Sequence, residues 1–176
     1  MNARDLVSIL LTIDGGDRKL RDLVNLHTVD ALVCLAAGAG AKEASSLLAF
    51  YRETGAGDAI SSAAGASAVI RFTEWDAIHV PSCATPDAMA VPAALAFAQD
   101  YGTYVKAVAA GHSVGVALSE AVGGVSALPE TWPGLFAAPA AAAVSAAIAL
   151  DLSEEQVAQA LVLAMAGSSG RNGRPS

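Results

Sequence analysis

Apolar side chains recur every three or four positions along most of the chain, and strict alternation of apolar and polar residues is nearly absent. Leu20, Leu23, Val24 and Ala31, for example, recur at the spacing of one face of a helix. Glycine and proline separate the repeats, which predicts helices over 3–13, 18–37, 42–52, 60–70, 86–99, 103–122, 132–150 and 153–166. The pattern therefore predicts an all-α fold, a bundle of about seven to eight helices.

Two local patterns predict how these helices begin and pack. Ser153-Glu154-Glu155-Gln156 has the spacing of a capping box, in which a serine and a glutamine satisfy the first backbone N–H groups reciprocally. Gly111 and Gly115 lie inside a predicted helix, where glycine is unfavourable relative to alanine. We therefore expect another backbone to pack closely against that helix.

The segments between the predicted helices do not indicate a second domain. No linker divides residues 1–167, so we expect one helical domain over that range. Residues 168–176 read SSGRNGRPS, a composition rich in Gly, Ser and Arg that is typical of a tail or a truncated linker.

The apolar fraction and the net charge indicate which kinds of partner the protein can bind. Apolar residues make up 54% of the chain and charged residues only 15%, more apolar surface than a monomer of this size can readily hide. We therefore expect an oligomer or a partner chain. The net charge of −7, with no basic run, argues against nucleic-acid binding.

Three features predict a cytoplasmic protein that does not enter a membrane. Every apolar run is interrupted before it reaches the roughly 18 residues of a membrane span. The opening residues MNARD lack the basic-then-apolar layout of a signal peptide. Cys34 and Cys83 give no disulfide framework, which is typical of a reducing compartment.

The segment from Arg71 to Gln99 concentrates the ionisable, hydroxyl and thiol groups of the chain between two apolar stretches. Thr85-Pro86-Asp87 predicts a helix start, with threonine as N-cap and proline at the first helical position. The free N–H groups and the dipole of such a start favour an anion. Thr85 is then either a cap alone or a cap that also contacts a bound carboxylate.

His79 is the best candidate for moving a proton, because Asp76 lies three residues before it and could orient and charge the imidazole. The alternative is a partly exposed loop histidine beside an acid at a helix end. Cys83 follows His79 by four residues, so a Cys/His nucleophile or a two-ligand metal site can be drawn. Two ligands do not make a zinc site, and a small cysteine is commonly buried, so we expect no metal.

The remaining polar or aromatic candidates have structural interpretations as well. Trp132, before Pro133, either lines a pocket or packs over a helix start. His27 and His112 lie inside predicted helices, where packing is the usual role of a histidine. Asp30 is expected to pair with His27 or Arg21 on its own helix.

Five fragments, taken in order, resemble the N-terminal part of the MmgE/PrpD family, which includes 2-methylcitrate dehydratase, cis-aconitate decarboxylase and iminodisuccinate epimerase. They are HTVDALVCLAAGAG, FTEWDAIHVPSCATPDAMAVPAALAFAQ, AVAAGHSVGVALSEAVGG, TWPGLFAAPAAAAVSAAIALDLSEEQVAQAL and AMAGSSG. The resemblance covers nearly the whole chain. It implies a helical domain, a dimer and an active site without a cofactor. It also implies that a proton is removed next to a carboxylate of a di- or tricarboxylic acid, followed by elimination, decarboxylation or inversion.

The chain departs from the family pattern at three site positions and in length. Ala77 stands where the family has threonine, Thr85 where many members have histidine, and Trp132-Pro133-Gly134 where many have His-Pro-Thr. The family's second, α+β domain is missing from the sequence, and its lysines, tyrosine and histidine help to form the pocket. The chain is thus expected to be one subunit of a split enzyme, a truncated form, or a helical domain with another use.

These observations give one preferred hypothesis and two alternatives. The preferred hypothesis is a lyase or isomerase, or a subunit of one, that acts on a small carboxylic acid. His79 and Asp76 would be catalytic, and Ser82, Thr85 and Trp132 would bind the substrate. The expected partners are a second copy or a chain carrying the missing domain. The alternatives are a non-catalytic helical dimerisation or scaffold module, and a repurposed lyase or cyclase acting on a more apolar substrate.

Overall fold

The computed structural model describes residues 2–55, 58–128 and 130–168, so most of the tail expected at 168–176 lies outside it. Within the described residues the chain forms eight α-helices and one 3-10 helix, and no strand. The elements are α1 (Ala3–Leu11), α2 (Arg18–Ala39), α3 (Lys42–Gly55), α4 (Ala59–Arg71), α5 (Pro86–Phe97), α6 (Tyr101–Ala121), η1 (Gly124–Ala127), α7 (Pro133–Ala149) and α8 (Glu154–Ala166). The predicted all-α bundle is confirmed.

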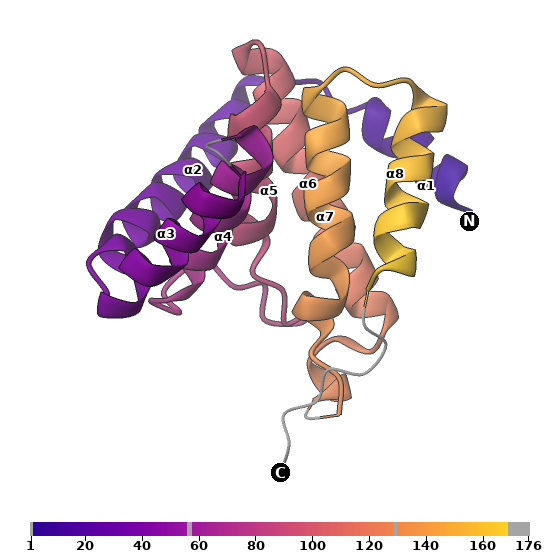
Figure 1. The fold of residues 1–176 in the computed structure, drawn as a ribbon. Coiled ribbons are helices and arrows are strands. Elements are labelled where there is room, and N and C mark those ends of the chain that lie inside the picture. The colour runs from indigo at the N-terminus through magenta and orange to yellow at the C-terminus, as the bar shows by residue number, and fades with distance from the viewer. Residues whose placement is uncertain (1, 56–57, 129, 169–176) are drawn as a thin grey trace.

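The helices pack in an order that brings α2, α5 and α6 together. α6 and α7 pair in the middle of the bundle, and α5 packs against both (Figure 1). On one side α4 covers α5 and α3 packs on α4, whereas on the other α8 packs on α7 and α1 on α8. α2 contacts α4, α5 and α6, so three segments distant in sequence meet where α5 begins.

Polar side chains set the starts of five helices by accepting a hydrogen bond from the N–H group three residues later. These caps are Asn2, Asp17, Asp58, Asp100 and Ser153. In the Ser153–Gln156 capping box both reciprocal bonds are present, which confirms the prediction for α8.

Close approach of helices explains the two glycines inside α6. A Cβ atom on Gly111 would lie 2.7 Å from the Cβ of Ala90 on α5 and 3.1 Å from the carbonyl oxygen of Ala141 on α7. At Gly115 the nearest atom would be the Cβ of Ala141, at 3.3 Å. The predicted close packing against α6 is confirmed.

α5 is buried over most of its length and carries one charge. Nine consecutive residues from Pro86 to Ala94 are buried, and all but Asp87 are apolar. The Asp87 side chain has no exposed surface. A carboxylate in this position requires polar partners, because burial of an isolated charge is strongly unfavourable.

α2 is exposed on the face opposite its buried side. Its exposed aliphatic side chains are Leu23, Leu26, Val29, Leu32 and Val33, whereas Val24, Ala31 and Cys34 face the core. By length and mean hydropathy α2 would be able to cross a membrane, although Asp22 and Asp30 interrupt its apolar residues. Core helices of soluble proteins and signal sequences can have the same length and hydropathy. This finding therefore does not show where in the cell the protein is located.

Candidate functional site

The start of α5 has the expected residues but not the expected cap. Thr85 occupies the N-cap position and Pro86 the first helical position, as predicted. The Thr85 side chain makes no capping hydrogen bond, with φ −114° and ψ 77°, so its prediction as a side-chain cap is wrong. The threonine lines a cavity instead.

A tight turn over residues 79–84 holds His79 beside this helix start. The His79 N–H donates to the carbonyl oxygen of Ala84 at 2.9 Å, and the Cys83 N–H donates to that of Val80 at 3.2 Å. Cys83 closes the turn in the left-handed region, with φ 55°. A further bond, from the N–H of Val125 to the carbonyl oxygen of Pro81 at 3.0 Å, ties the turn to η1.

Ser82 orients the His79 ring. Its Oγ lies 2.8 Å from His79 Nδ1 and 3.2 Å from the carbonyl oxygen of His79, and the serine is fully buried. If the hydroxyl donates to the carbonyl, it accepts from an Nδ1–H group. That tautomer leaves the lone pair on Nε2, which is the form a general base requires.

Asp76 does not orient His79, contrary to the sequence-based expectation. Its Oδ1 forms an ion pair with Arg71 Nη1, and its buried Oδ2 accepts no hydrogen bond from the part of the chain that the structure describes. Burial raises the pKa of the Asp76 carboxyl group, and the attraction of Arg71 opposes this rise. Asp76 therefore acts within the packing of the 71–85 segment.

Asp30 also differs from its expected role. Its Oδ2 accepts a hydrogen bond from the backbone N–H of Ala77 at 3.0 Å, rather than pairing with Arg21 or His27. The contact joins α2 to the segment that carries His79. The predicted pairing within α2 is wrong because the side chain reaches a neighbouring loop.

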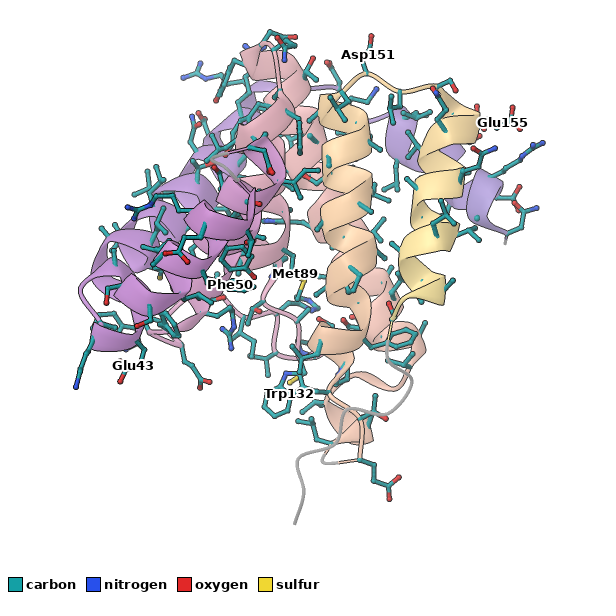
Figure 2. All side chains as sticks on the ribbon, in the orientation of Figure 1. Glu43, Phe50, Met89, Trp132, Asp151 and Glu155 are labelled. Atoms are coloured by element: carbon teal, nitrogen blue, oxygen red, sulfur yellow. The ribbon has the colours of Figure 1, made fainter. Side chains whose placement is uncertain are left out.

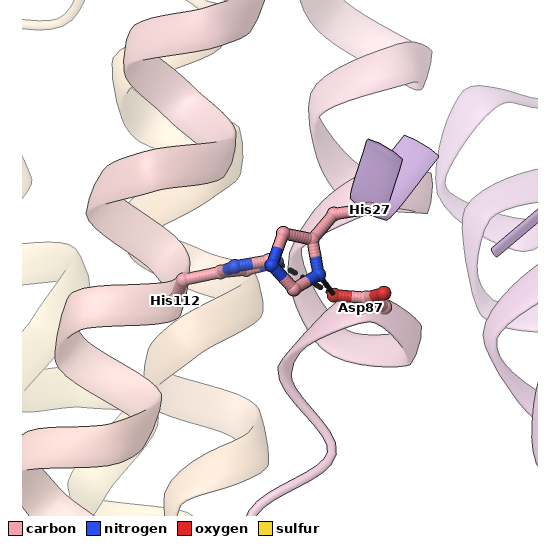
Figure 3. Close-up of side chains that lie close together, drawn as sticks. All are labelled: His27, Asp87 and His112. Carbon is pink, nitrogen blue, oxygen red and sulfur yellow. Dashed lines mark ion pairs between the residues drawn. The ribbon is translucent and has the colours of Figure 1, made fainter. Parts of the chain in front are cut away.

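Three helices contribute to a cluster formed by His27, Asp87 and His112. His27 Nδ1 lies 2.8 Å and His112 Nε2 lies 3.1 Å from the same oxygen, Asp87 Oδ1. Figure 3 shows both imidazole rings directed at this carboxylate, with the ring centroids 4.8 Å apart and nearly perpendicular. The His27 side chain is 27% exposed and that of His112 is 17% exposed, so the cluster is buried at Asp87 and reaches solvent through the rings.

The polar atoms of the cluster lie close together but do not form hydrogen bonds with one another. Both oxygens of Asp87 and Nε2 of His112 are buried and have no hydrogen bond of acceptable angle in the described residues. The two rings and the carboxylate therefore converge on one point without satisfying one another by hydrogen bonds.

All three histidines of the chain line one cavity. His27, His79 and His112 surround a space of about 380 Å³ together with Ile78, Pro86 and Ser113. Its volume lies within the range of sites for small molecules. The cavity thus has one imidazole held by Ser82 and two beside a buried carboxylate, which is a set of groups suited to proton transfer or to metal binding.

Thr85 and Trp132 line a different and larger cavity, of about 570 Å³. It lies between α4, α5 and α7, contains Arg71 and Met89, and is otherwise mostly apolar. Figure 2 shows Met89 and Trp132 beside α7, on the side that faces α4 and α5. The residues predicted to act with His79 are therefore divided: Ser82 contacts it, whereas Thr85 and Trp132 belong to the second cavity.

Cys34 offers no activated nucleophile. Both cysteines are buried and free, and burial raises the pKa of the Cys34 thiol, with a smaller contribution from the charge of Asp30. A raised pKa disfavours the reactive thiolate.

Sequence reasoning missed Asp87, His27 and His112 as site residues, although the chain contained a signal for each. Asp87 begins a stretch that is otherwise apolar, and an acid in a buried helix needs a partner. His27 shares the helical face of Val24 and Ala31, and His112 lies next to Gly111 on the closely packed face of α6. Helical spacing alone thus directs both rings inward, but only the packing of α2 and α6 shows that they meet.

Comparisons with family models, with curated proteins and with solved structures gave no match. The resemblance to the MmgE/PrpD family stays a prediction, and the function is argued below from the site.

Proposed function

We propose that this protein is an enzyme, or an enzyme subunit, that removes a proton next to the carboxylate of a small carboxylic acid. The observation that carries the proposal is the gathering of all three histidines around one cavity, above a buried carboxylate. The reaction class is that of a lyase or an isomerase, in agreement with the family resemblance.

His79 is the proposed base. Nδ1 is engaged by Ser82, so Nε2 is the ring nitrogen that would accept a proton from the substrate carbon. The C–H bond breaks, its electron pair stays on the carbon and spreads into the adjacent carboxylate, and the imidazole becomes positively charged. In an elimination, this electron pair forms a carbon–carbon double bond while the leaving group departs from the neighbouring carbon and takes the proton from the imidazolium. In an isomerisation, a water-derived acid protonates the carbon on its other face and the imidazolium returns its proton to water.

The wall formed by His27 and His112 is proposed to hold the substrate carboxylate. His27 Nδ1 and His112 Nε2 face Asp87, so His27 Nε2 and His112 Nδ1 are the ring nitrogens that can donate an N–H group to a substrate carboxylate. Such donors stabilise the negative charge that develops on an enolate-like intermediate. Asp87 lies beside both rings, behind the residues that line the cavity.

The experiment is solvent-deuterium exchange, which detects proton removal before the overall reaction is known. The full chain, alone and co-purified with any chain that associates with it, would be incubated in D₂O with a set of mono-, di- and tricarboxylic acids. Loss of the signal of the hydrogen next to the carboxylate would be followed by proton NMR. We expect exchange with at least one acid and a decrease of about 10²–10⁴-fold in the His79→Ala variant.

Two further variants sharpen this test. Ser82→Ala should decrease exchange less than His79→Ala does, because the base remains but is no longer oriented. Glu74→Gln changes an exposed acid of the same segment and should leave exchange unchanged. Exchange that survives His79→Ala, or no exchange with any acid in either preparation, contradicts the proposal.

The rival proposal is a helical dimerisation or scaffold module. The exposed aliphatic face of α2 favours it, because such a face is typical of an interface with another chain. Both proposals include a partner, either a second copy or a chain that supplies a further domain. They differ in whether the protein catalyses a reaction in the cavity. The deuterium-exchange experiment measures this directly.

A further inference from the structure

We propose that His27, Asp87 and His112 bind a divalent transition-metal ion at the wall of the three-histidine cavity. The ligand atoms would be His27 Nδ1, His112 Nε2 and a carboxylate oxygen of Asp87, one each from α2, α6 and α5. The sequence alone predicted packing roles for His27 and His112, a helix start at Asp87, and no metal.

The distances between the ligand atoms suit a shared ion. Zinc and iron(II) bind histidine nitrogen and carboxylate oxygen at about 2.0–2.2 Å, so two neighbouring ligands lie about 2.8–3.5 Å apart. The separations of 2.8 Å and 3.1 Å from Asp87 Oδ1 fall in this range, and all three ligand atoms lie within 4.8 Å of one another. Binding one ion would also bring the two histidine nitrogens, which lie within 4.8 Å of each other, into this range.

The unsatisfied polar atoms are an independent observation that points to an ion. Asp87 has no exposed surface, and neither of its oxygens accepts a hydrogen bond of acceptable angle from the described residues. His112 Nε2 is buried without a hydrogen bond as well. A buried carboxylate and a buried imidazole nitrogen left in this way are costly, whereas a cation between them satisfies both.

The set of ligands indicates the class of metal. Two imidazoles and one carboxylate bind zinc in catalytic sites and iron(II) in sites that keep open positions, whereas magnesium and calcium prefer oxygen ligands. Three protein ligands leave at least one position of a four-coordinate ion open. Because His27 and His112 both line the cavity, we infer that the open position faces it.

An ion in this place would take the role assigned above to the N–H groups of the two rings. It would bind the substrate carboxylate and stabilise negative charge as a Lewis acid. This part of the inference rests on the proposed function, whereas metal binding itself does not.

The test is a titration of the metal-free full chain with Zn²⁺ by calorimetry and with Co²⁺ by visible absorption. No substrate is present, so the result does not depend on the proposed reaction. We expect one ion per chain and the absorption bands of Co²⁺ in a low-symmetry site with nitrogen and oxygen ligands. Asp87→Asn and His112→Gln should each weaken binding by about tenfold or more.

His79→Gln is the matched control, because His79 lines the same cavity but is not one of the three ligands. It should keep the stoichiometry and the affinity of the unaltered chain. Circular dichroism would show whether each variant folds, and His27→Gln replaces any ligand variant that does not. Absence of stoichiometric binding, or equal loss in the His79→Gln variant, overturns the proposal.

Deuterium exchange with and without a chelator separates the two proposals. Exchange that depends on His79 but is insensitive to the chelator retains the proposed function and rejects the catalytic part of the metal inference. Stoichiometric binding in a protein that exchanges no substrate hydrogen retains the metal site and rejects the proposed function.

Discussion

Asp76 and Asp87 are both buried carboxylates, but their partners differ at the residue scale. Asp76 pairs with the guanidinium group of Arg71, a fixed positive charge. Asp87 faces two imidazoles, which are common metal ligands. Asp76 is therefore suited to hold the 71–85 segment in place, and Asp87 is suited to a metal site.

Replacement of Arg71 by methionine should destabilise the fold. The aliphatic part of the side chain is retained, but the buried Asp76 carboxylate loses its ion-pair partner. Loss of one partner of a fully buried pair costs about 3–5 kcal/mol. Because the Arg71 side chain is 35% exposed, we expect a smaller decrease in the free energy of unfolding at neutral pH, about 2–3 kcal/mol. Urea denaturation measures this value.

The pH dependence of the Arg71→Met effect gives a second measurement. The pKa of the folded Asp76 carboxyl group is already raised by burial, and removal of Arg71 raises it further. An ionised Asp76 therefore opposes folding above this pKa, and protonation relieves the cost as the pH falls. The loss of stability in Arg71→Met should shrink as the pH falls toward the ordinary range of aspartate. Glu74→Gln, which alters an exposed partner 4.0 Å from Arg71, should change stability by less than about 0.5 kcal/mol at any pH.

Helix packing around α6 sets the geometry of the site at the element scale. α5 and α7 approach α6 closely at Gly111, one residue before the ligand candidate His112. A change in the distance between α5 and α6 would therefore move His112 relative to Asp87. The small side chains on these helices thus have a direct effect on the site.

Gly111→Ala and Gly115→Ala form a matched pair that tests this packing. Both changes improve helix propensity by about 1 kcal/mol. At Gly111 the new Cβ would lie 2.7 Å from the Cβ of Ala90, which requires a shift of α5 and costs about 1–3 kcal/mol. From the difference between these two effects, we expect Gly111→Ala to lower the free energy of unfolding by up to about 2 kcal/mol.

Gly115→Ala should be nearly neutral, because its closest contact would be 3.3 Å, to the Cβ of Ala141. Urea denaturation of both variants gives the comparison. A larger loss of stability at Gly115 than at Gly111 would contradict the packing described here.

The sequence predicted the elements of this bundle better than the site that they build. Helix spacing and glycine or proline breaks are local, so the eight helices and the capping box at Ser153 could be predicted. The pairing of Asp76 with Arg71 and the contact of Asp30 with Ala77 depend on side-chain direction in an irregular segment. His27, Asp87 and His112 are separated by 60 and 25 residues, and only the crossing of α2, α5 and α6 places them together.

At the scale of the whole molecule, α2 has an apolar face that does not pack against the core and is exposed to solvent. Leu26, Val29 and Val33 recur three and four residues apart on the side opposite Val24 and Ala31. Leu26 is 71% exposed. Apolar side chains at helical spacing on a solvent-facing surface are typical of a contact with another protein. The cavity and this face lie on different sides of the same helix, so a partner on α2 can hold His27 in place without covering the site.

The double variant Leu26→Glu with Val33→Glu tests the partner that both functional proposals include. Burial of these side chains contributes about 1 kcal/mol each when roughly half of their surface is removed from water, and a buried unpaired glutamate opposes association further. We expect the unaltered chain to sediment as an assembly, and the double variant to sediment as a monomer with the same helical circular dichroism.

Leu163→Glu on α8 is the matched control, because Leu163 is 72% exposed, almost the same as Leu26. It should leave the sedimentation coefficient unchanged. Equal dissociation in the control, or the same mass for the unaltered chain and the double variant, would contradict an interface at α2. Such a result would require the apolar excess of the sequence to be buried on another face.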